Sequence, residues 1–283
     1  MAPIMPFDSL APGTPRPAAL PRLWASLPVS RGFPVGLVLP IALLGVLELA
    51  VRLGWVPGRL LPPPTEVART LVELAHNGLA AHVLVSVLRV ATGFALGAVV
   101  GVVVGSFVGL SRRAEALFDP SLQALRAIPS LAWVPLLLLW LGIDELPKVA
   151  LIALGSFFPV YLNLVSSIHN VDRKWVEVGQ MYGLSGAGLV RRILLPASLP
   201  GLFTGLRAGL GLSWMFLVAA ELIAATRGIG YLLSDGRETG RADIVVAAIV
   251  LLAVLGKISD GALKAVERRL LCWRDVYSTR GEA

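Results

Sequence analysis

The sequence has little charge and almost no cysteine. Of its 283 residues, only 15% are Asp, Glu, Lys or Arg, whereas a soluble domain carries about 25%. The single cysteine, Cys272, excludes an internal disulfide and a cysteine-based metal site. Because 56% of the residues are hydrophobic and the mean hydropathy is +0.77, the composition is typical of a membrane protein.

Motifs for nucleotide hydrolysis and for common enzyme chemistry are also missing. Gly256-Lys257 lacks the upstream glycine and the following Ser or Thr of a phosphate-binding loop. Of the three histidines, His76 and His82 lie about 240° apart around a helix, which does not suit a shared metal ion. No nucleophile elbow and no paired acidic motif occur. We therefore predict that the chain is not an enzyme and has no catalytic residues, no metal and no cofactor of its own.

The net charge of +7 does not indicate a nucleic-acid partner. The charges lie at the ends of apolar runs, and no basic stripe interleaved with aromatic residues is present. Charges in such positions orient a chain in a membrane, because cytoplasmic loops are enriched in Lys and Arg.

Six apolar runs are long enough to cross a hydrocarbon core of ~30 Å. They cover residues 34–53, 83–110, 122–141, 149–168, 201–225 and 244–263. The fold class that we predict is all-α, a polytopic membrane protein with six transmembrane helices. The expected N-terminal parts are a disordered cytoplasmic tail over 1–33, followed over 34–80 by a first transmembrane helix and an interfacial amphipathic helix (66–76). The expected permease core covers 81–266 and includes a cytoplasmic loop over 170–196. A cytoplasmic C-terminal tail is expected over 267–283.

Glycine and proline mark packing positions in these runs. The second run contains a glycine at every fourth position, which allows two helix backbones to approach closely. These glycines are Gly93, Gly97, Gly101, Gly105 and Gly109. Pro129 and Pro135 interrupt the third run, where a kink could lie beside a conduction path or could serve packing alone. Arg89 is expected to be paired or near a membrane interface.

The fifth run has two distinct faces. Gly201, Gly205 and Gly209 form one stripe, and Arg207, Trp214 and Glu221 fall together on the opposite side at ~100° per residue. Charged groups inside a span usually face protein or water. This face could line the solute path, or Arg207 and Glu221 could simply mark the two membrane interfaces.

The basic residues are distributed unequally between the two sides that six spans define. One side, which includes both termini, holds Arg16, Arg22, Arg31, Arg112, Arg113, Arg173, Lys174, Arg191, Arg192, Lys264, Arg268, Arg269, Arg274 and Arg280. The other side holds Arg52, Arg59, Arg69, Lys148, Arg227, Arg237 and Arg241. We therefore predict that both termini are cytoplasmic.

A polar, glycine-bearing stretch lies between the fourth and fifth runs. Trp175, Val178 and Tyr182 recur at helical spacing, which predicts a short surface helix. Asp172 is its expected N-cap, and Gly183 its left-handed end. A second short helix, capped by Ser185, should then run to a break at Leu195-Pro196.

The spacing of Glu177, Gly183, Ile193 and Leu195-Pro196 resembles the cytoplasmic loop of permease subunits in binding-protein-dependent ABC importers. The family usually has two alanines after the glutamate, where this chain has Val178 and Gly179, and a glycine there costs roughly 1 kcal/mol of helix stability. LPPPTEV, SVLRVATGF and Gly228-Ile229-Gly230-Tyr231 also resemble the family, the first two its sulfonate, taurine and nitrate branch.

The resemblance implies a type-1 permease fold in a bacterial inner membrane. It also implies a complex with a second permease copy, two cytoplasmic ATPase subunits that bind ATP, and an extracytoplasmic solute-binding protein, with no nucleic acid. The implied ATPase-coupling residues are Glu177, Gly183, Trp175, Gln180, Tyr182, Ile193 and Pro196. The implied solute is an aliphatic sulfonate or taurine, with nitrate, bicarbonate or a vitamin precursor as alternatives.

Two other classes of protein remain as alternatives. A membrane-embedded enzyme should show acids or histidines clustered at one membrane face, and a secondary transporter should show internal repeats with paired broken helices. The sequence shows neither feature clearly.

Overall fold

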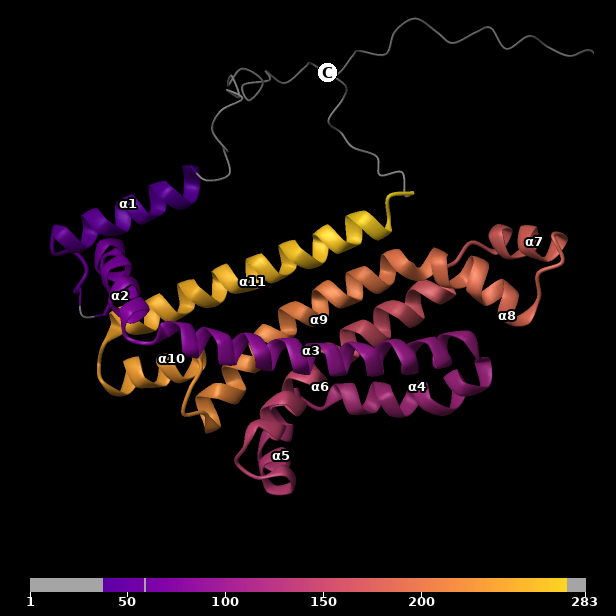
Figure 1. Ribbon diagram of the computed structural model, residues 1–283, viewed down its shortest axis with the longest axis horizontal. Helices are drawn as coiled ribbons and strands as arrows, with labels where there is room; N and C mark the ends of the chain where they lie inside the picture. Colours follow the sequence, from indigo (N-terminus) through magenta and orange to yellow (C-terminus); the bar gives the residue numbers. More distant parts are fainter. Residues whose placement is uncertain (1–37, 59, 274–283) are drawn as a thin grey trace, which may run out of the picture. The chain divides into compact units, whose positions relative to one another are not determined.

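The computed structural model describes residues 38–58 and 60–273, and their regular structure is helical throughout (Figure 1). The described part of the chain divides between Val46 and Leu47 into two units. The helices are α1 (Val38–Arg52), α2 (Pro64–His76), α3 (Leu79–Leu110), α4 (Arg112–Ala127), α5 (Val134–Leu141), α6 (Glu145–His169), α7 (Arg173–Met181), α8 (Gly186–Leu189), α9 (Leu195–Ala224), α10 (Ile229–Glu238) and α11 (Ala242–Leu270). The predicted tail 1–33, residues 34–37 of the first predicted span and residues 274–283 lie outside the described residues.

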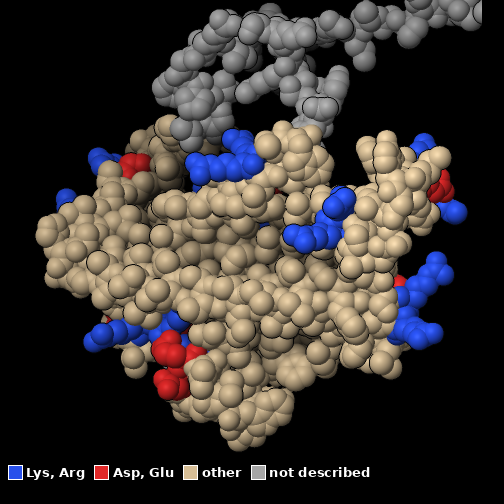
Figure 2. Space-filling model, turned by 45° about the vertical axis from the view of Figure 1, so that its right-hand side comes forward, with Lys and Arg blue, Asp and Glu red and all other residues tan. Residues whose placement is uncertain are grey.

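Four helical segments in the described residues are long and apolar enough to cross a membrane. They are Leu79–Leu110, Glu145–His169, Gly186–Ile223 and Ala242–Leu270. In Figure 2 a broad band without Lys, Arg, Asp or Glu crosses the visible face, with charged residues above it, below it and at its right-hand end. Four of the six predicted spans therefore correspond to long helices.

The third predicted span, residues 122–141, is not one continuous helix but part of a sharply bent pair of helices. Residues Arg112–Ala127 and Ser130–Leu141 meet at an angle of 88°. Pro129 forces the preceding Ile128 into an extended conformation (φ −75°, ψ 122°) and so ends α4. Pro135 lies in the first turn of α5, where its missing N–H costs nothing. If the bent pair is one span, the described residues contain five.

The glycine ladder of α3 packs closely against another helix, as predicted, and the structure identifies that helix as α6. From Gly93 to Gly109, the positions where a Cβ would stand meet Ile152, Ser156, Val160, Leu164 and Ile168 in turn. These five residues form a matching stripe along α6 and are 0–6% exposed. A Cβ on Gly97 would overlap Ser156 Oγ and the Ala153 carbonyl, so only glycine permits this approach.

The glycine stripe of α9 covers another side of α6. Gly201 lies against Ser167, Gly205 against Asn163 and Pro159, and Gly209 against Ser156. Helix α6 is therefore the centre of the core, with α3 and α9 as its main neighbours (Figure 1).

These contacts also fix the directions of the helices. Residue numbers rise together along α3 and α6, from the Gly93–Ile152 contact to the Gly109–Ile168 contact, so the two helices are parallel. Numbers run in opposite directions along α6 and α9, so these two are antiparallel. Because α3 and α6 are parallel, the segment between them has to return from the Leu110 end of α3 to the end where α6 begins.

Several predicted boundaries need correction. The helix does not break at Pro196, because a π-helix over Val190–Leu194 leads directly into α9 and Pro196 lies in the first turn of α9. The segment between the fifth and sixth predicted spans, residues 226–243, is not only a connection but contains α10. Helix α11 extends to Leu270, four residues into the predicted tail 267–283. The helix predicted over 66–76 is present as α2, which begins at Pro64.

Candidate functional site

The loop between α6 and α9 presents a short, exposed amphipathic helix. Asp172 caps α7 by accepting a hydrogen bond from the Lys174 backbone N–H at 2.9 Å, and Gly183 ends the turn with φ +75°. Both features are as predicted. Ser185 occupies the N-cap position of α8, but its side chain makes no capping hydrogen bond, so that part of the prediction was wrong.

Large apolar side chains of this loop point away from the protein. Met181 is 87% exposed, Tyr182 84% and Trp175 63%. Glu177 and Gln180 are also exposed. An apolar group of this size, surrounded by polar residues on a loop between spans, is typical of a surface that docks another protein.

The opposite side of α7 is fixed to the helix that leads into α9. Gly179 is buried, and Ile193 Cδ1 and Leu189 Cδ1 occupy the space that a Cβ at this position would take. The glycine that replaces the family's second alanine therefore allows α7 to pack closely on the π-helix. Helix continues from Gly186 to Ile223, so α7 rests on the segment that leads into α9.

Glu177 has only a weak partner within the chain. Its carboxylate accepts a hydrogen bond from Arg173 Nε at 2.9 Å, one helical turn away, and the two side chains are 56% and 89% exposed. Exposed pairs of this kind contribute ~0–1 kcal/mol, so Glu177 is free to exchange Arg173 for another cation.

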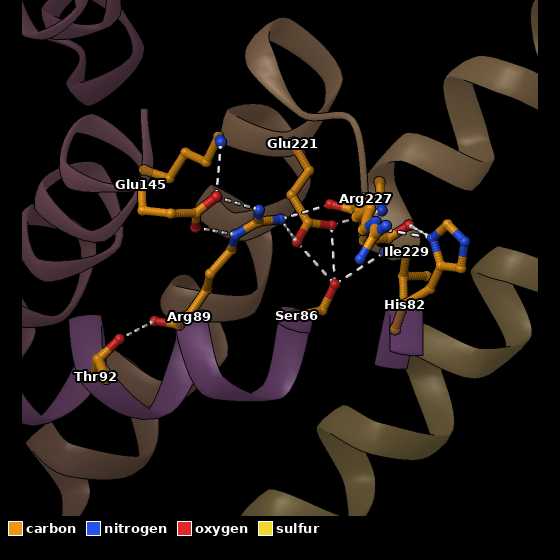
Figure 3. A network of polar contacts seen from close by, with 11 residues as sticks. His82, Ser86, Arg89, Thr92, Glu145, Glu221, Arg227 and Ile229 are labelled. Carbon is orange, nitrogen blue, oxygen red and sulfur yellow. Dashed lines mark hydrogen bonds and ion pairs between the residues drawn. The ribbon is translucent and has the colours of Figure 1, made fainter. Parts of the chain in front are cut away.

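A second polar cluster, far from this loop, surrounds Arg89 and Glu221 (Figure 3). Arg89 on α3 donates two hydrogen bonds of 2.6 Å to Glu145 at the start of α6, and a third of 2.8 Å to Glu221 near the end of α9. The side chain of Glu221 has no exposed surface, and that of Arg89 is 6% exposed. Arg89 is therefore paired, and it has two partners, Glu145 and Glu221.

The same carboxylate also holds the turn before α10. Glu221 accepts hydrogen bonds from Ser86 Oγ at 2.7 Å and from the Gly230 backbone N–H at 2.7 Å. Ser86 Oγ in turn accepts from Ile229 N–H at 2.9 Å, and Arg89 Nη1 donates to the Arg227 carbonyl at 2.7 Å. Residues of α3, α6, α9 and α10 are thus joined in one network, which we call the Glu221 network (Figure 3). Its centre, Glu221 and Arg89, is buried, whereas the Glu145 side chain is 54% exposed.

The predicted face of α9 is divided between two surroundings. Arg207 pairs with Asp260 of α11, with Nε–Oδ1 at 2.9 Å and Nη2–Oδ2 at 3.2 Å, and Trp214 Nε1 donates to Ser259 Oγ of α11 at 2.9 Å. Glu221 belongs to the buried network instead. The structure therefore brings Arg207 and Trp214 together beside α11 and places Glu221 apart from them.

Sequence reasoning missed the partners Ser86, Glu145, Ser259 and Asp260. An ionised or polar residue inside an apolar run could have indicated that such partners exist, because it needs a partner at the same depth in the membrane. Among residues 38–58 and 60–273, no group of three or more His, Cys, Asp or Glu is arranged to hold a metal ion.

The long packed helices and the exposed docking loop define a polytopic membrane component that works with a partner protein. The chain belongs to the binding-protein-dependent transport system inner membrane component family, whose model matches residues 79–271. It is a multi-pass inner-membrane permease of an ABC importer and not an enzyme, and in this class of transporter the ATPase activity resides in partner subunits.

Relatives cover nearly the whole chain. It is 41% identical over 247 residues to the putative aliphatic sulfonates transport permease protein SsuC of Bacillus subtilis, covering 87% of this chain and 90% of that protein. It is 44% identical over 240 residues to the protein of the same name from Escherichia coli, covering 84% and 91%. Identity to the taurine transport system permease protein TauC of Escherichia coli is 34% over 258 residues, covering 89% and 94%.

Proposed function

We propose that this permease imports aliphatic sulfonates as one of two copies in a complex with two cytoplasmic ATPase subunits and an extracytoplasmic binding protein. The identity of 41–44% to proteins named for aliphatic sulfonates, against 34% to one named for taurine, supports this solute class. The permease core is proposed to span residues 81–266, and both termini to be cytoplasmic.

The observation that carries the proposed mechanism is the two-sided packing of α7. Its exposed side offers Trp175, Met181 and Tyr182 to a partner, while its buried side rests on the helix that continues into α9. We propose that Trp175, Glu177, Gln180, Tyr182, Gly183, Ile193 and Pro196 transmit closure of the ATPase pair to the spans. Glu177 then pairs with a basic residue of the ATPase, which replaces Arg173.

Two substitutions test this coupling. Glu177→Arg places like charges across the interface and beside Arg173, and should reduce ATPase copurification and abolish ATP-driven uptake. Gly183→Val strains the φ +75° turn by roughly 1–2 kcal/mol and should reduce uptake by redirecting the end of α7. Neither lies in a long apolar helix, so insertion and yield should be unchanged.

The matched control is Glu238→Arg, a charge reversal at the end of α10. It should leave copurification unchanged. Normal uptake by both loop variants at normal expression would remove the coupling proposal.

The solute class is tested separately with the binding protein. Uptake into vesicles that contain the whole complex should be driven by binding protein loaded with ethanesulfonate. Taurine, nitrate and bicarbonate are compared in the same assay. Uptake of bicarbonate without ethanesulfonate uptake would favour another solute class, since a bicarbonate transport system permease protein of Synechococcus elongatus is 31% identical over 69% of this chain.

We also propose that the face carrying Arg207, Trp214 and Glu221 borders the solute path. The part-exposed Arg207, whose side chain is 36% exposed, supports this for the stretch beside α11, whereas Glu221 is enclosed by the network. Single cysteines at positions 207 and 214 should react with a water-soluble thiol reagent in an ATP-dependent manner, whereas a cysteine at the enclosed position 221 should react less. Inertness at both positions 207 and 214 would show that the face is not wetted.

A further inference from the structure

The Arg207–Asp260 pair is an unusual feature of the α9–α11 contact. Both residues lie inside helices that qualify as membrane spans, yet their side chains are 36% and 34% exposed. Exposed charges cannot face lipid cheaply, so this surface has to meet water or protein. It differs in this respect from the Glu221 network, whose central carboxylate has no exposed surface.

The guanidinium of Arg207 is not fully used by its partners. Asp260 accepts from Nε and Nη2 at 2.9 and 3.2 Å, while Nη1 has only Glu267 at 3.7 Å, beyond hydrogen-bond distance. A guanidinium has five N–H donors in a planar fork. The Asp260 carboxylate therefore occupies one edge of the Arg207 guanidinium, and further N–H donors of the guanidinium remain on a part-exposed surface.

The charges around the pair favour an anion. Lys257 and Lys264 lie on α11 about one turn before and one turn after Asp260, so they share its side of the helix. With Arg207, the set has three cations against the two carboxylates of Asp260 and Glu267. Trp214, held by Ser259, adds an aromatic surface two turns further along α9.

We propose that Arg207 binds the oxyanion group of the solute during its passage, and that Asp260 occupies the guanidinium when no solute is present. Under the proposed function this oxyanion is a sulfonate, so the inference rests on that function for the identity of its ligand. A sulfonate has the oxygen spacing that a guanidinium fork binds in bidentate fashion. Displaced Asp260 stays near Lys257 and Lys264, so that it is not left without a cation.

Direct binding to the intact permease–ATPase complex tests this inference. The complex is placed in phosphatidylcholine nanodiscs without binding protein, and binding of radiolabelled ethanesulfonate is measured. Asp260→Asn removes the competing carboxylate and should tighten the dissociation constant about tenfold. Arg207→Lys keeps the charge but loses the fork, and should weaken binding strongly. Because Asp260→Asn predicts a gain of binding, misfolding cannot produce the expected result.

Asp243→Asn is the matched control, since Asp243 pairs with Arg241 at 2.6 Å near the other end of α11. It should leave the dissociation constant unchanged. Unchanged binding in Asp260→Asn, or wild-type binding in Arg207→Lys, would overturn the proposal.

Two further arms separate the possible ligands. Binding is repeated in phosphatidylglycerol nanodiscs at an ionic strength that screens the surface potential. Ethanesulfonate binding should persist in phosphatidylglycerol. If it disappeared, Arg207 would be assigned to a lipid headgroup and the proposal would be overturned. Bicarbonate and nitrate are then tested in place of ethanesulfonate. If only one of these anions binds, and its binding depends on Arg207, the oxyanion site is supported and the sulfonate function is contradicted. If Arg207→Lys takes up sulfonate normally, the sulfonate function is supported and the oxyanion site is contradicted.

Discussion

Glu221 illustrates how a single carboxylate is stabilised inside a long apolar helix. Its side chain has no exposed surface, but Arg89, Ser86 and the Gly230 backbone N–H all donate to it. Burial of a charge is tolerated only when a partner and further hydrogen bonds compensate it. Glycine is also required nearby, because a Cβ on Gly228 would overlap the Glu221 carboxylate. The Glu221 network therefore fixes the turn between α9 and α10.

Glu221→Gln should destabilise the permease by about 3 kcal/mol, the lower end of the cost of breaking a buried pair. The neutral amide weakens the contact with Arg89 and turns an N–H₂ group toward donors. Thermal unfolding of the purified permease measures the effect, with Glu73→Gln as control, since Glu73 is 54% exposed and 3.9 Å from Arg241. Equal melting temperatures for the two variants would show that the network does not stabilise the fold.

The need for such a network can be predicted from the sequence, but its members cannot. Arg89 stands alone in an apolar run, which predicts that it is paired or near a membrane interface. Its partner Glu221 is 132 residues away in the sequence, and its partner Glu145 is 56 residues away. Only the packing of α3, α6 and α9 determines which carboxylates reach the guanidinium.

At the scale of elements, glycine spacing determines how the helices pack. Five glycines of α3 match a stripe of α6 that includes Ile152, Ser156 and Val160, and the glycines of α9 cover another side of α6. Small residues at this spacing let backbones approach in lipid, where association depends on van der Waals packing rather than on the hydrophobic effect.

Gly97→Ala should therefore destabilise the permease by about 1–3 kcal/mol, the usual cost of overpacking. The new Cβ would overlap the Ala153 carbonyl, which belongs to the backbone of α6 and cannot move aside easily. Gly211→Ala on α9 is the matched control, because no heavy atom lies within 4 Å of its Cβ position. Thermal unfolding should show a loss for the first variant and little change for the second, and the opposite order would contradict this packing.

The ends and breaks of the elements were harder to predict than the elements themselves. Pro129 was expected to kink a span, but it separates two helices, because Ile128 has to be extended before it. Pro196 was expected to break a helix, but the π-helix over Val190–Leu194 continues into α9 without a break. In both cases the proline restricts the backbone, and the neighbouring contacts decide between a break and a continuous helix.

For the molecule as a whole, the parallel packing of α3 and α6 constrains the topology. The chain leaves α3 at one end of the core and has to begin α6 at the other, so the bent pair α4–α5 covers the distance between them. Helix α9 runs antiparallel to α6. Helix α11 runs antiparallel to α9, because Arg207 lies near Glu267 while Trp214, two turns later, lies near Gly256. The described residues contain four helices long enough to cross a membrane, and the bent pair makes a fifth crossing if it is one span. We propose that it is one span and that a further crossing near α1 completes six.

Reporter fusions test this topology. Fusions after Arg113, Arg192 and Arg274 should report cytoplasm, and fusions after Gly142 and Arg237 the outside, because basic residues favour the cytoplasmic side. The fusion after Gly142 is decisive for the bent pair. If α4 and α5 only dipped into the membrane, position 142 would lie inside, and α6 would then have to run antiparallel to α3. That direction is incompatible with the Gly93–Ile152 and Gly109–Ile168 contacts. An external signal after Arg192 would instead reverse the orientation and place α7 out of reach of a cytoplasmic ATPase.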